Sequence, residues 1–179
     1  MEFRPIGTLS TPFATIADCP RNGRQIKPAP LCRATVLPEF VPGLASLEGF
    51  SHLILLYWMH LAGEPRLVFT PPFDNEPRGV FATRAPWRPN PIGLSVVAFE
   101  GFDGADGLLV RNLDCVDGTA LLDIRPYLPT TDAEPDARAG WLERTRRRDE
   151  AGLGAVASEL KQNLHPAPGP SGCLNSPTK

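Results

Sequence analysis

Two arginines and an asparagine, Arg84, Arg88 and Asn90, stand between prolines in the segment GVFATRAPWRPNPIGLS, residues 79–95. Their side chains offer hydrogen-bond donors and two positive charges, which suit an anionic or polar ligand. Each proline fixes its own φ angle and restricts the residue before it, so the backbone that carries these side chains is stiff. A stiff loop loses little conformational entropy on binding, which favours a ligand site. The alternative is that the segment is only a connection stiffened by its prolines, with the arginine side chains in solvent.

The same segment predicts how these side chains are presented. Apolar and polar residues alternate over residues 80–84, the period of a strand that buries one face and ends at Arg84. Trp87 lies between the two arginines and adds an aromatic ring to the same stretch.

Carboxylates concentrate in a second segment, LDCVDGTALLDIRPYLP, residues 113–129. Asp114 and Asp117 lie at a predicted two-residue turn, Asp117-Gly118, and Asp123 follows in the next predicted strand. Such carboxylates can bind a cationic group or accept a proton. Two structural alternatives stay open: Asp117 only makes its turn, and Asp114 and Asp123 form buried ion pairs with arginines.

The segments that must position these residues are short, and apolar and polar residues alternate along them. This pattern predicts a mainly β protein. Turn signals at residues 102–107 and 117–118 indicate hairpins, and therefore an antiparallel barrel or sandwich. His60 ends the long apolar segment SHLILLYWMHL, where a lone histidine is more often a core residue than a catalytic one. The predicted strands cover residues 3–9, 32–37, 51–61, 94–99, 108–113, 113–116 and 119–124.

The run FATRAPWRPNPIGLS, residues 81–95, followed by the aspartate-bearing segment of residues 113–129, resembles the signature of the TsaA/TrmO family. Supporting pieces of the pattern span most of residues 6–133. The resemblance implies a single antiparallel β-barrel that uses S-adenosyl-L-methionine to methylate tRNA. It further implies that the acceptor is N6 of threonylcarbamoyladenosine at position 37, beside the anticodon.

The resemblance also implies a cofactor site. In the family, a proline two positions before a glutamine contacts the cofactor, and here Asn22 stands in place of that glutamine. Given such a cofactor, Arg84 is the best donor for its carboxylate, Leu94 can form an apolar wall, and the backbone of residues 114–117 can contact adenine and ribose. The predicted cofactor-binding residues are Pro20, Arg21, Asn22, His60, Leu61, Arg84, Leu94, Asp114, Cys115, Val116 and Asp117. Trp87, Arg88 and Asn90 are predicted to bind substrate, and Asp117, Asp123 and His60 are unranked candidates for the catalytic base.

Two further hypotheses compete with a tRNA methyltransferase. One is a non-catalytic barrel that binds an adenosine-containing ligand or RNA, and the other is a methyltransferase with a different acceptor. Members of the family resemble one another in forming homodimers whose cofactor pocket takes residues from the partner subunit, and we expect the same here. Binding of S-adenosylmethionine together with methylation of tRNA separates the three hypotheses.

The composition limits the remaining possibilities. With 18 basic and 20 acidic side chains among 179 residues, the net charge is −2, so a nucleic-acid partner must meet a local patch. Four cysteines without a CxxC spacing argue against a metal site and predict reduced thiols. The first residues lack the apolar core of a signal peptide, and no apolar run is long enough to span a bilayer, so we expect a cytoplasmic protein.

The chain is predicted to divide into three parts. We expect the barrel over residues 1–133, a helical extension over residues 134–164, with a helix at 136–148, and a disordered tail over residues 165–179. Arg144 and the three arginines at 146–148 form a second basic cluster, which is either a solvated helix end or an RNA contact.

Overall fold

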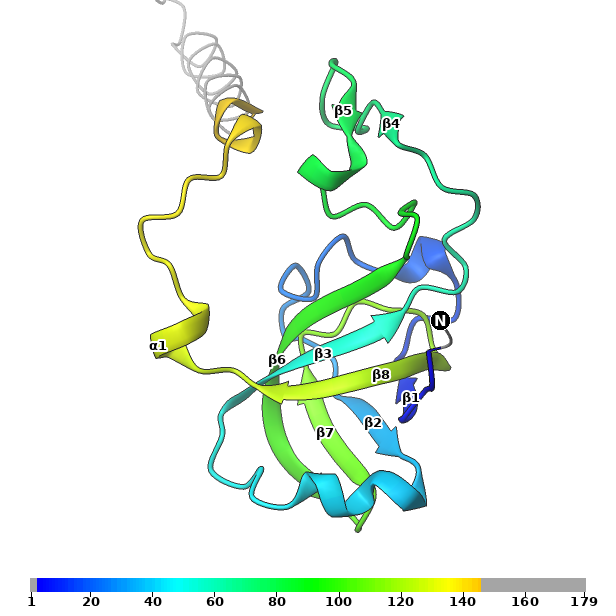
Figure 1. The fold of residues 1–179 in the computed structure, drawn as a ribbon, viewed down its shortest axis with the longest axis vertical. Helices are drawn as coiled ribbons and strands as arrows, with labels where there is room; N and C mark the ends of the chain where they lie inside the picture. The colour runs from blue at the N-terminus through cyan, green and yellow to red at the C-terminus, as the bar shows by residue number, and fades with distance from the viewer. Residues whose placement is uncertain (1–2, 146–179) are drawn as a thin grey trace, which may run out of the picture. The chain divides into compact units, whose positions relative to one another are not determined.

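Six antiparallel strands close into a barrel in the computed structural model, which describes residues 3–145 (Figure 1). Around the barrel the order is β1-β2-β7-β6-β3-β8, and β8 closes it against β1. The alternating segments predicted an antiparallel barrel or sandwich, and the single barrel implied by the family resemblance is confirmed. The strands are β1 (Gly7–Ser10), β2 (Cys32–Val36), β3 (His52–Trp58), β6 (Ile92–Asp103), β7 (Gly107–Arg111) and β8 (Thr119–Pro126).

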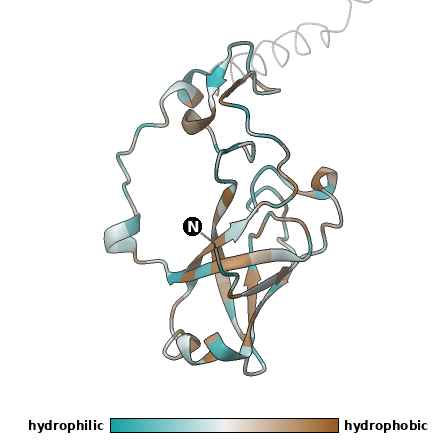
Figure 2. Ribbon diagram, turned by 45° about the vertical axis from the view of Figure 1, so that its right-hand side comes forward, coloured by the Kyte–Doolittle hydropathy of each residue, from teal (hydrophilic) through white to brown (hydrophobic). Residues whose placement is uncertain are grey.

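Strand β3 shows why this sequence makes a barrel wall. Leu53, Leu55 and Tyr57 point inward and are buried, while the residues between them are half-buried on the outer face. Hydrophobic residues recur in the same way along the neighbouring strands (Figure 2). The core that results joins the fully buried side chains of Leu9, Ala34, Leu53, Leu55, Val97, Leu108, Val110 and Leu121.

The hairpin predicted at residues 102–107 is confirmed, because β6 and β7 pair there from Asp103 and Gly107 onward. The strand predicted at residues 94–99 is longer than expected. Strand β6 runs from Ile92 to Asp103, and its register shifts between Phe99 and Gly101. Such a bulge lets one long strand bend around the barrel while it pairs with both neighbours.

The arm, residues 62–91, extends beyond the barrel between β3 and β6 (Figure 1). It contains the two-stranded sheet of β4 (Val68–Phe69) and β5 (Arg78–Gly79), followed by the short helix η3 (Val80–Ala82). The strand predicted over residues 80–84 is therefore wrong. The carbonyl oxygen of Val80 accepts two hydrogen bonds from Thr83, one from the Thr83 backbone nitrogen (3.1 Å) and one from the Thr83 hydroxyl (2.9 Å). These bonds close a turn.

The hairpin predicted around Asp117-Gly118 is also wrong. Strand β7 pairs with β2 and β6, whereas β8 pairs with β1 and β3, so residues 112–118 cross over the end of the barrel. Asn112 starts this crossover with a φ of 69°, and Thr119 N donates to Val116 O (3.3 Å) where it ends. The sequence does contain a turn there, but the turn joins a crossover to a strand. A turn signal does not reveal which strands become neighbours.

Three short helices complete the barrel unit. Helices η1 (Ile16–Asp18) and η2 (Pro38–Leu44) lie in the connections before and after β2, and α1 (Pro129–Asp132) follows β8. Contacts within the chain define one compact unit up to residue 134 and a second from residue 135. None of the helices among residues 3–145 is long and apolar enough to cross a membrane.

The second unit is described only over residues 135–145. Its residues 141–145 are helical, and Leu142 N donates to Ala139 O in the turn that precedes them. The helix predicted from residue 136 thus begins later than expected. The rest of that helix, the basic residues 146–148 and the predicted tail lie outside the described residues.

Candidate functional site

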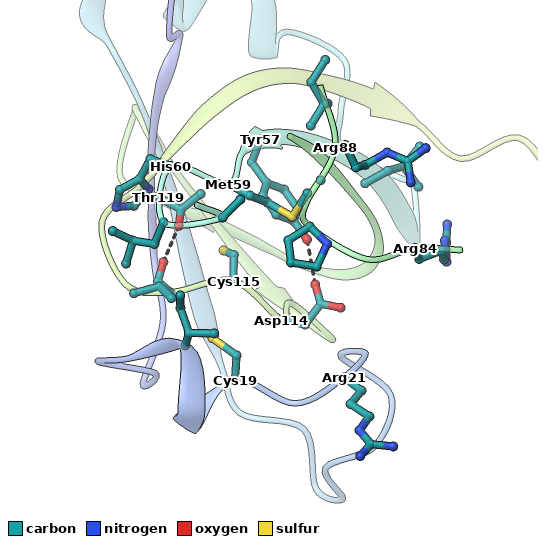
Figure 3. A pocket seen from close by; sticks show the side chains of 18 of the residues that line it. Cys19, Arg21, Tyr57, Met59, His60, Arg84, Arg88, Asp114, Cys115 and Thr119 are labelled. Atoms are coloured by element: carbon teal, nitrogen blue, oxygen red, sulfur yellow. Dashed lines mark hydrogen bonds between the residues drawn. The ribbon is translucent and has the colours of Figure 1, made fainter. Parts of the chain in front are cut away.

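A cavity of about 630 Å³ opens where four segments meet at one end of the barrel (Figure 3). The end of β3 and the start of β6 form one wall, the crossover of residues 112–118 forms another, and the loop before β2 and the arm contribute the rim. Cavities of this volume commonly hold cofactors and small ligands. The two segments singled out by their arginines and aspartates therefore share one cavity.

Most of the predicted cofactor-binding residues line this cavity. They are Pro20, Arg21, Asn22, His60, Leu61, Arg84, Leu94, Asp114, Cys115 and Val116. Trp87 and Arg88, predicted to bind substrate, line it as well. Asn90, Asp117 and Asp123 are not among its lining residues.

Two of these outlying residues have structural partners. Asp117 is exposed; its Oδ1 accepts a hydrogen bond from Thr11 N (3.0 Å) and its own N–H donates to Phe13 O (2.8 Å). Asp123 forms a partly exposed ion pair with Arg125 across 2.9 Å. These contacts match the structural alternatives for the two aspartates, except that the ion pair is not buried.

Asp114 is held by two hydroxyl groups that sequence reasoning missed. Tyr57 Oη donates to Asp114 Oδ1 at 2.8 Å, and Ser95 Oγ donates to the same oxygen at 2.7 Å. Burial, reinforced by the Asp114 carboxylate, raises the pKa of the Tyr57 phenol above its usual range. One sequence signal was available, since Tyr57 falls on the apolar face of its strand and a buried phenol needs a hydrogen-bond partner.

The three arginines that line the cavity differ in how they are engaged. Arg88 donates from Nη1 to two backbone carbonyl oxygens of its own loop and lies over the Phe81 ring, 5.6 Å from its centroid. Arg21 lies over the ring of Phe73 at 5.6 Å. Arg84 is exposed and has no hydrogen bond or ion pair with any residue among those described. Its guanidinium is therefore the one best placed to take an anionic group of a ligand.

Trp87 is fixed in place on the arm. Its ring meets Phe69 edge-on at 5.1 Å, and the guanidinium of Arg66 lies 5.1 Å from its centroid. Arg66 N also donates to Trp87 O (3.0 Å). An indole held from two sides gives the cavity a rigid aromatic border.

The cavity thiols are poor nucleophiles. Burial raises the pKa of Cys115 to about 12, and it also raises the pKa of Cys19. Both side chains are therefore neutral thiols near neutral pH. Among residues 3–145, no group of histidine, cysteine and acidic side chains is arranged to hold a metal ion.

The charges around the cavity suit a zwitterion. Among the described residues that line the cavity, Asp114 is the one carboxylate, and it is accompanied by Arg21, Arg84 and Arg88. A ligand with both a cationic and an anionic group can therefore find a partner for each. His60, which is exposed at the rim, adds an imidazole to these groups.

Comparisons with known proteins agree on one family. The model of the tRNA-methyltransferase O N-terminal domain matches residues 8–133. A Pyrococcus abyssi protein named "Probable S-adenosyl-L-methionine-binding protein" is 45% identical over 142 residues, which are 79% of this chain and 76% of that protein. The tRNA (adenine(37)-N6)-methyltransferase of Escherichia coli is 36% identical over 150 residues, 79% of this chain and 64% of that enzyme.

A solved structure gives the same result. The crystal structure of TrmO from Pseudomonas aeruginosa has a TM-score of 0.65 at 41% identity, and the match covers 78% of this chain and 61% of that one. This chain thus spans less than two thirds of the length of that protein and of the E. coli enzyme. It spans 38% of an Archaeoglobus fulgidus relative named "Probable S-adenosyl-L-methionine-binding protein", which is 41% identical over 80% of this chain.

Proposed function

The chain belongs to the tRNA-methyltransferase O family, and on that premise we propose that it is an S-adenosyl-L-methionine-dependent enzyme that methylates N6 of an adenosine in tRNA. The observation that carries the proposal is the meeting of Arg84 and Asp114 in one cavity. These residues come from two segments some thirty positions apart in the sequence. The S-adenosyl-L-methionine-binding relatives and the E. coli enzyme support the same cofactor and reaction.

The cavity fits this cofactor by size and by charge. The methionine part of S-adenosyl-L-methionine carries a carboxylate, an ammonium and a sulfonium, and the cavity offers arginines together with a carboxylate. We assign Arg84 to the ligand carboxylate and Asp114 to the cationic groups. Leu94 and the loop residues Pro20 and Asn22 would enclose the remainder of the ligand.

Proton removal is a separate requirement of the reaction. The cofactor would supply an electrophilic methyl group: its transfer to the adenosine N6 would leave the electron pair of the carbon–sulfur bond on sulfur and would require N6 to lose a proton. His60 is the candidate base that lines the cavity, whereas Asp117 and Asp123 are engaged elsewhere. We therefore assign the N6 proton to the imidazole of His60.

We further propose that the acceptor is threonylcarbamoyladenosine at position 37 of tRNA. An amide-like N6 is a poor nucleophile, so the protein must hold it in line with the methyl group and provide a base. Trp87 offers a rigid ring for stacking a nucleotide, and exposed arginines around it, Arg66 and Arg84, can contact phosphates. Asn90 remains a proposed substrate contact from the same loop.

A homodimer is part of the proposal. Large apolar side chains are exposed along the arm: Phe81 by 74%, Val68 by 64% and Leu67 by 61%. Leu61 and Leu94, at the cavity, are exposed by 49% and 44%. Exposed apolar groups of this kind are typical of an interface, and a second copy of the chain covering them would bring the partner subunit to the cavity. We place the enzyme in the cytoplasm, where its tRNA substrate is.

Two measurements test the proposed function. S-Adenosyl-L-methionine is expected to raise the Tm of the protein, since a ligand that binds only the folded state stabilises it. Incubation with the cofactor and tRNA that carries threonylcarbamoyladenosine is expected to add one methyl group to that nucleoside, measured by mass spectrometry of the digested tRNA. An unchanged Tm would contradict the cofactor assignment. Binding without methylation would favour a non-catalytic module or a different acceptor.

A further inference from the structure

Three oxygen atoms form a compact cluster beside the cavity, two of them on the lining residues Tyr57 and Asp114 and one on the buried Ser95 behind them. Tyr57 Oη and Ser95 Oγ lie 3.0 Å apart, and each lies within hydrogen-bond distance of Asp114 Oδ1, at 2.8 and 2.7 Å. Both bonds reach the same carboxylate oxygen. The other oxygen, Oδ2, receives no hydrogen bond from the described residues, and Figure 3 shows it pointing away from Tyr57.

We propose that Tyr57 and Ser95 are positioning residues that hold Asp114 with Oδ2 toward the cavity, where it binds the cationic groups of the cofactor. This inference rests on the proposed function, because it names the part of the site that meets the ammonium and sulfonium. A carboxylate with one oxygen held by two donors has a fixed orientation and keeps its second oxygen for the ligand.

The charge of the cavity gives this orientation its importance. Asp114 is the one carboxylate among the described lining residues, against three arginines. A cationic group that enters the cavity finds no other negatively charged partner among residues 3–145 that line it. If Asp114 turned away, the ligand ammonium and sulfonium would face arginines, and like charges repel more strongly in a partly buried site than in water.

The barrel holds the two hydroxyl groups rigidly. Tyr57 and Ser95 are 5% and 7% exposed and lie on the paired strands β3 and β6. Tyr57 is opposite Gly93 in that pairing, and a Cβ atom at position 93 would collide with the Tyr57 ring. The glycine therefore leaves the space in which the phenol lies across β6 and reaches Asp114. Because its pKa is raised, the phenol remains a donor throughout the usual assay range.

The test measures binding of two ligands to Tyr57→Phe, Ser95→Ala and Asp114→Asn by calorimetry. S-Adenosyl-L-methionine carries the cationic groups, whereas 5′-methylthioadenosine keeps adenine and ribose but is neutral. We expect the Kd for S-adenosyl-L-methionine to rise roughly three- to tenfold in each hydroxyl variant and more in Asp114→Asn, with the Kd for methylthioadenosine unchanged. In the Asp114→Asn background, adding either hydroxyl substitution should not raise the Kd for S-adenosyl-L-methionine any further.

Several results would overturn the inference. One is an unchanged Kd for S-adenosyl-L-methionine in either hydroxyl variant, another is equal weakening of both ligands, and a third is full additivity with Asp114→Asn. Ser95→Ala removes one oxygen only, so it keeps the test valid if Tyr57→Phe loses its fold. Tyr127→Phe, a phenol outside the cavity lining, serves as the matched control. Failure of the wild-type protein to bind S-adenosyl-L-methionine would instead refute the proposed function.

Discussion

Arg88 donates from Nη1 to the carbonyl oxygen of Thr83 at 3.0 Å, and thereby fixes the residue that precedes Arg84. The same nitrogen donates to Val80 O, also at 3.0 Å. Arg88, which the sequence analysis predicts to bind substrate, thus also stabilises the conformation of its own loop. The position of Arg84 at the cavity depends on a neighbour four residues along the chain.

Replacing Arg88 should therefore affect both stability and cofactor binding. Arg88→Ala removes the side-chain donor to Thr83 O and one of the donors to Val80 O, and we expect it to lower the free energy of unfolding by about 1–2 kcal/mol and to weaken binding of S-adenosyl-L-methionine. Urea unfolding and calorimetry measure the two effects. Arg125→Ala, which removes a surface ion pair, should cost less than about 1 kcal/mol. Wild-type stability in Arg88→Ala would show that the hydrogen bonds of Arg88 to its own loop do not stabilise the folded protein.

Arg84 should matter for binding alone. Its guanidinium has no partner among the described residues, so Arg84→Ala is expected to leave the Tm of the free protein within about 2 °C of wild type. Loss of a charge-assisted pair should raise the Kd for S-adenosyl-L-methionine by about tenfold or more. Arg84→Lys should restore part of the affinity, since a lysine keeps the charge but not the paired donors. Arg4→Ala, an exposed arginine outside the cavity, is the control.

Asp117 can be tested as a structural residue against its role as a candidate base. Its Oδ1 accepts a hydrogen bond from Thr11 N, which an amide oxygen can also accept. Asp117→Ala should therefore lower the free energy of unfolding by about 1 kcal/mol, and Asp117→Asn should restore most of the stability together with near-normal kcat. A stable Asp117→Asn protein that has lost its activity would show instead that the carboxylate takes part in catalysis.

The sequence pattern was sufficient for an antiparallel β fold because burial alternates along the strands, as the inward residues Leu53 and Leu55 illustrate, whereas the choice of a barrel over a sandwich came from the family resemblance. The resemblance of two segments was sufficient to group Arg84 with Asp114. Both inferences rely on information that lies within a short stretch of chain. The predicted strand at residues 80–84 failed because pairing with β4 ends at Gly79, and beyond Val80 the hydrogen bond from Thr83 N to Val80 O closes a turn instead.

The features that were missed depend on pairing between distant segments. Tyr57 meets Asp114 only because β3 pairs with β6 in one register and because the crossover passes over the barrel end. A shift of one residue would turn Tyr57 to the outer face. Neither the register nor the path of the crossover is encoded in local alternation, so the hydroxyl pair around Asp114 was not predictable from spacing.

The importance of that register can be tested with two glycines. Gly93→Ala places a methyl group against the Tyr57 ring, and we expect a loss of about 1–3 kcal/mol in the free energy of unfolding together with weaker cofactor binding. Gly43→Ala is the matched control, because a Cβ atom there meets nothing within 4 Å. Urea unfolding compares the two variants. Equal stability would show that the Tyr57 ring moves aside without cost.

The buried thiols predict a loss of stability at alkaline pH. Burial raises the pKa of Cys115 to about 12, whereas an unperturbed thiol has a value of 9.0. As the pH rises, the unfolded chain therefore releases this proton before the folded protein does. The contribution of the buried neutral thiol to the free energy of unfolding is complete below pH 9.0 and is lost as the pH rises toward about 12. Between pH 8 and 10, one such thiol should account for a fall of about 1 kcal/mol in the free energy of unfolding. Cys115→Ala should reduce that fall by the same amount in urea titrations at the two pH values, while an identical fall in both proteins would show that the thiol is accessible to solvent.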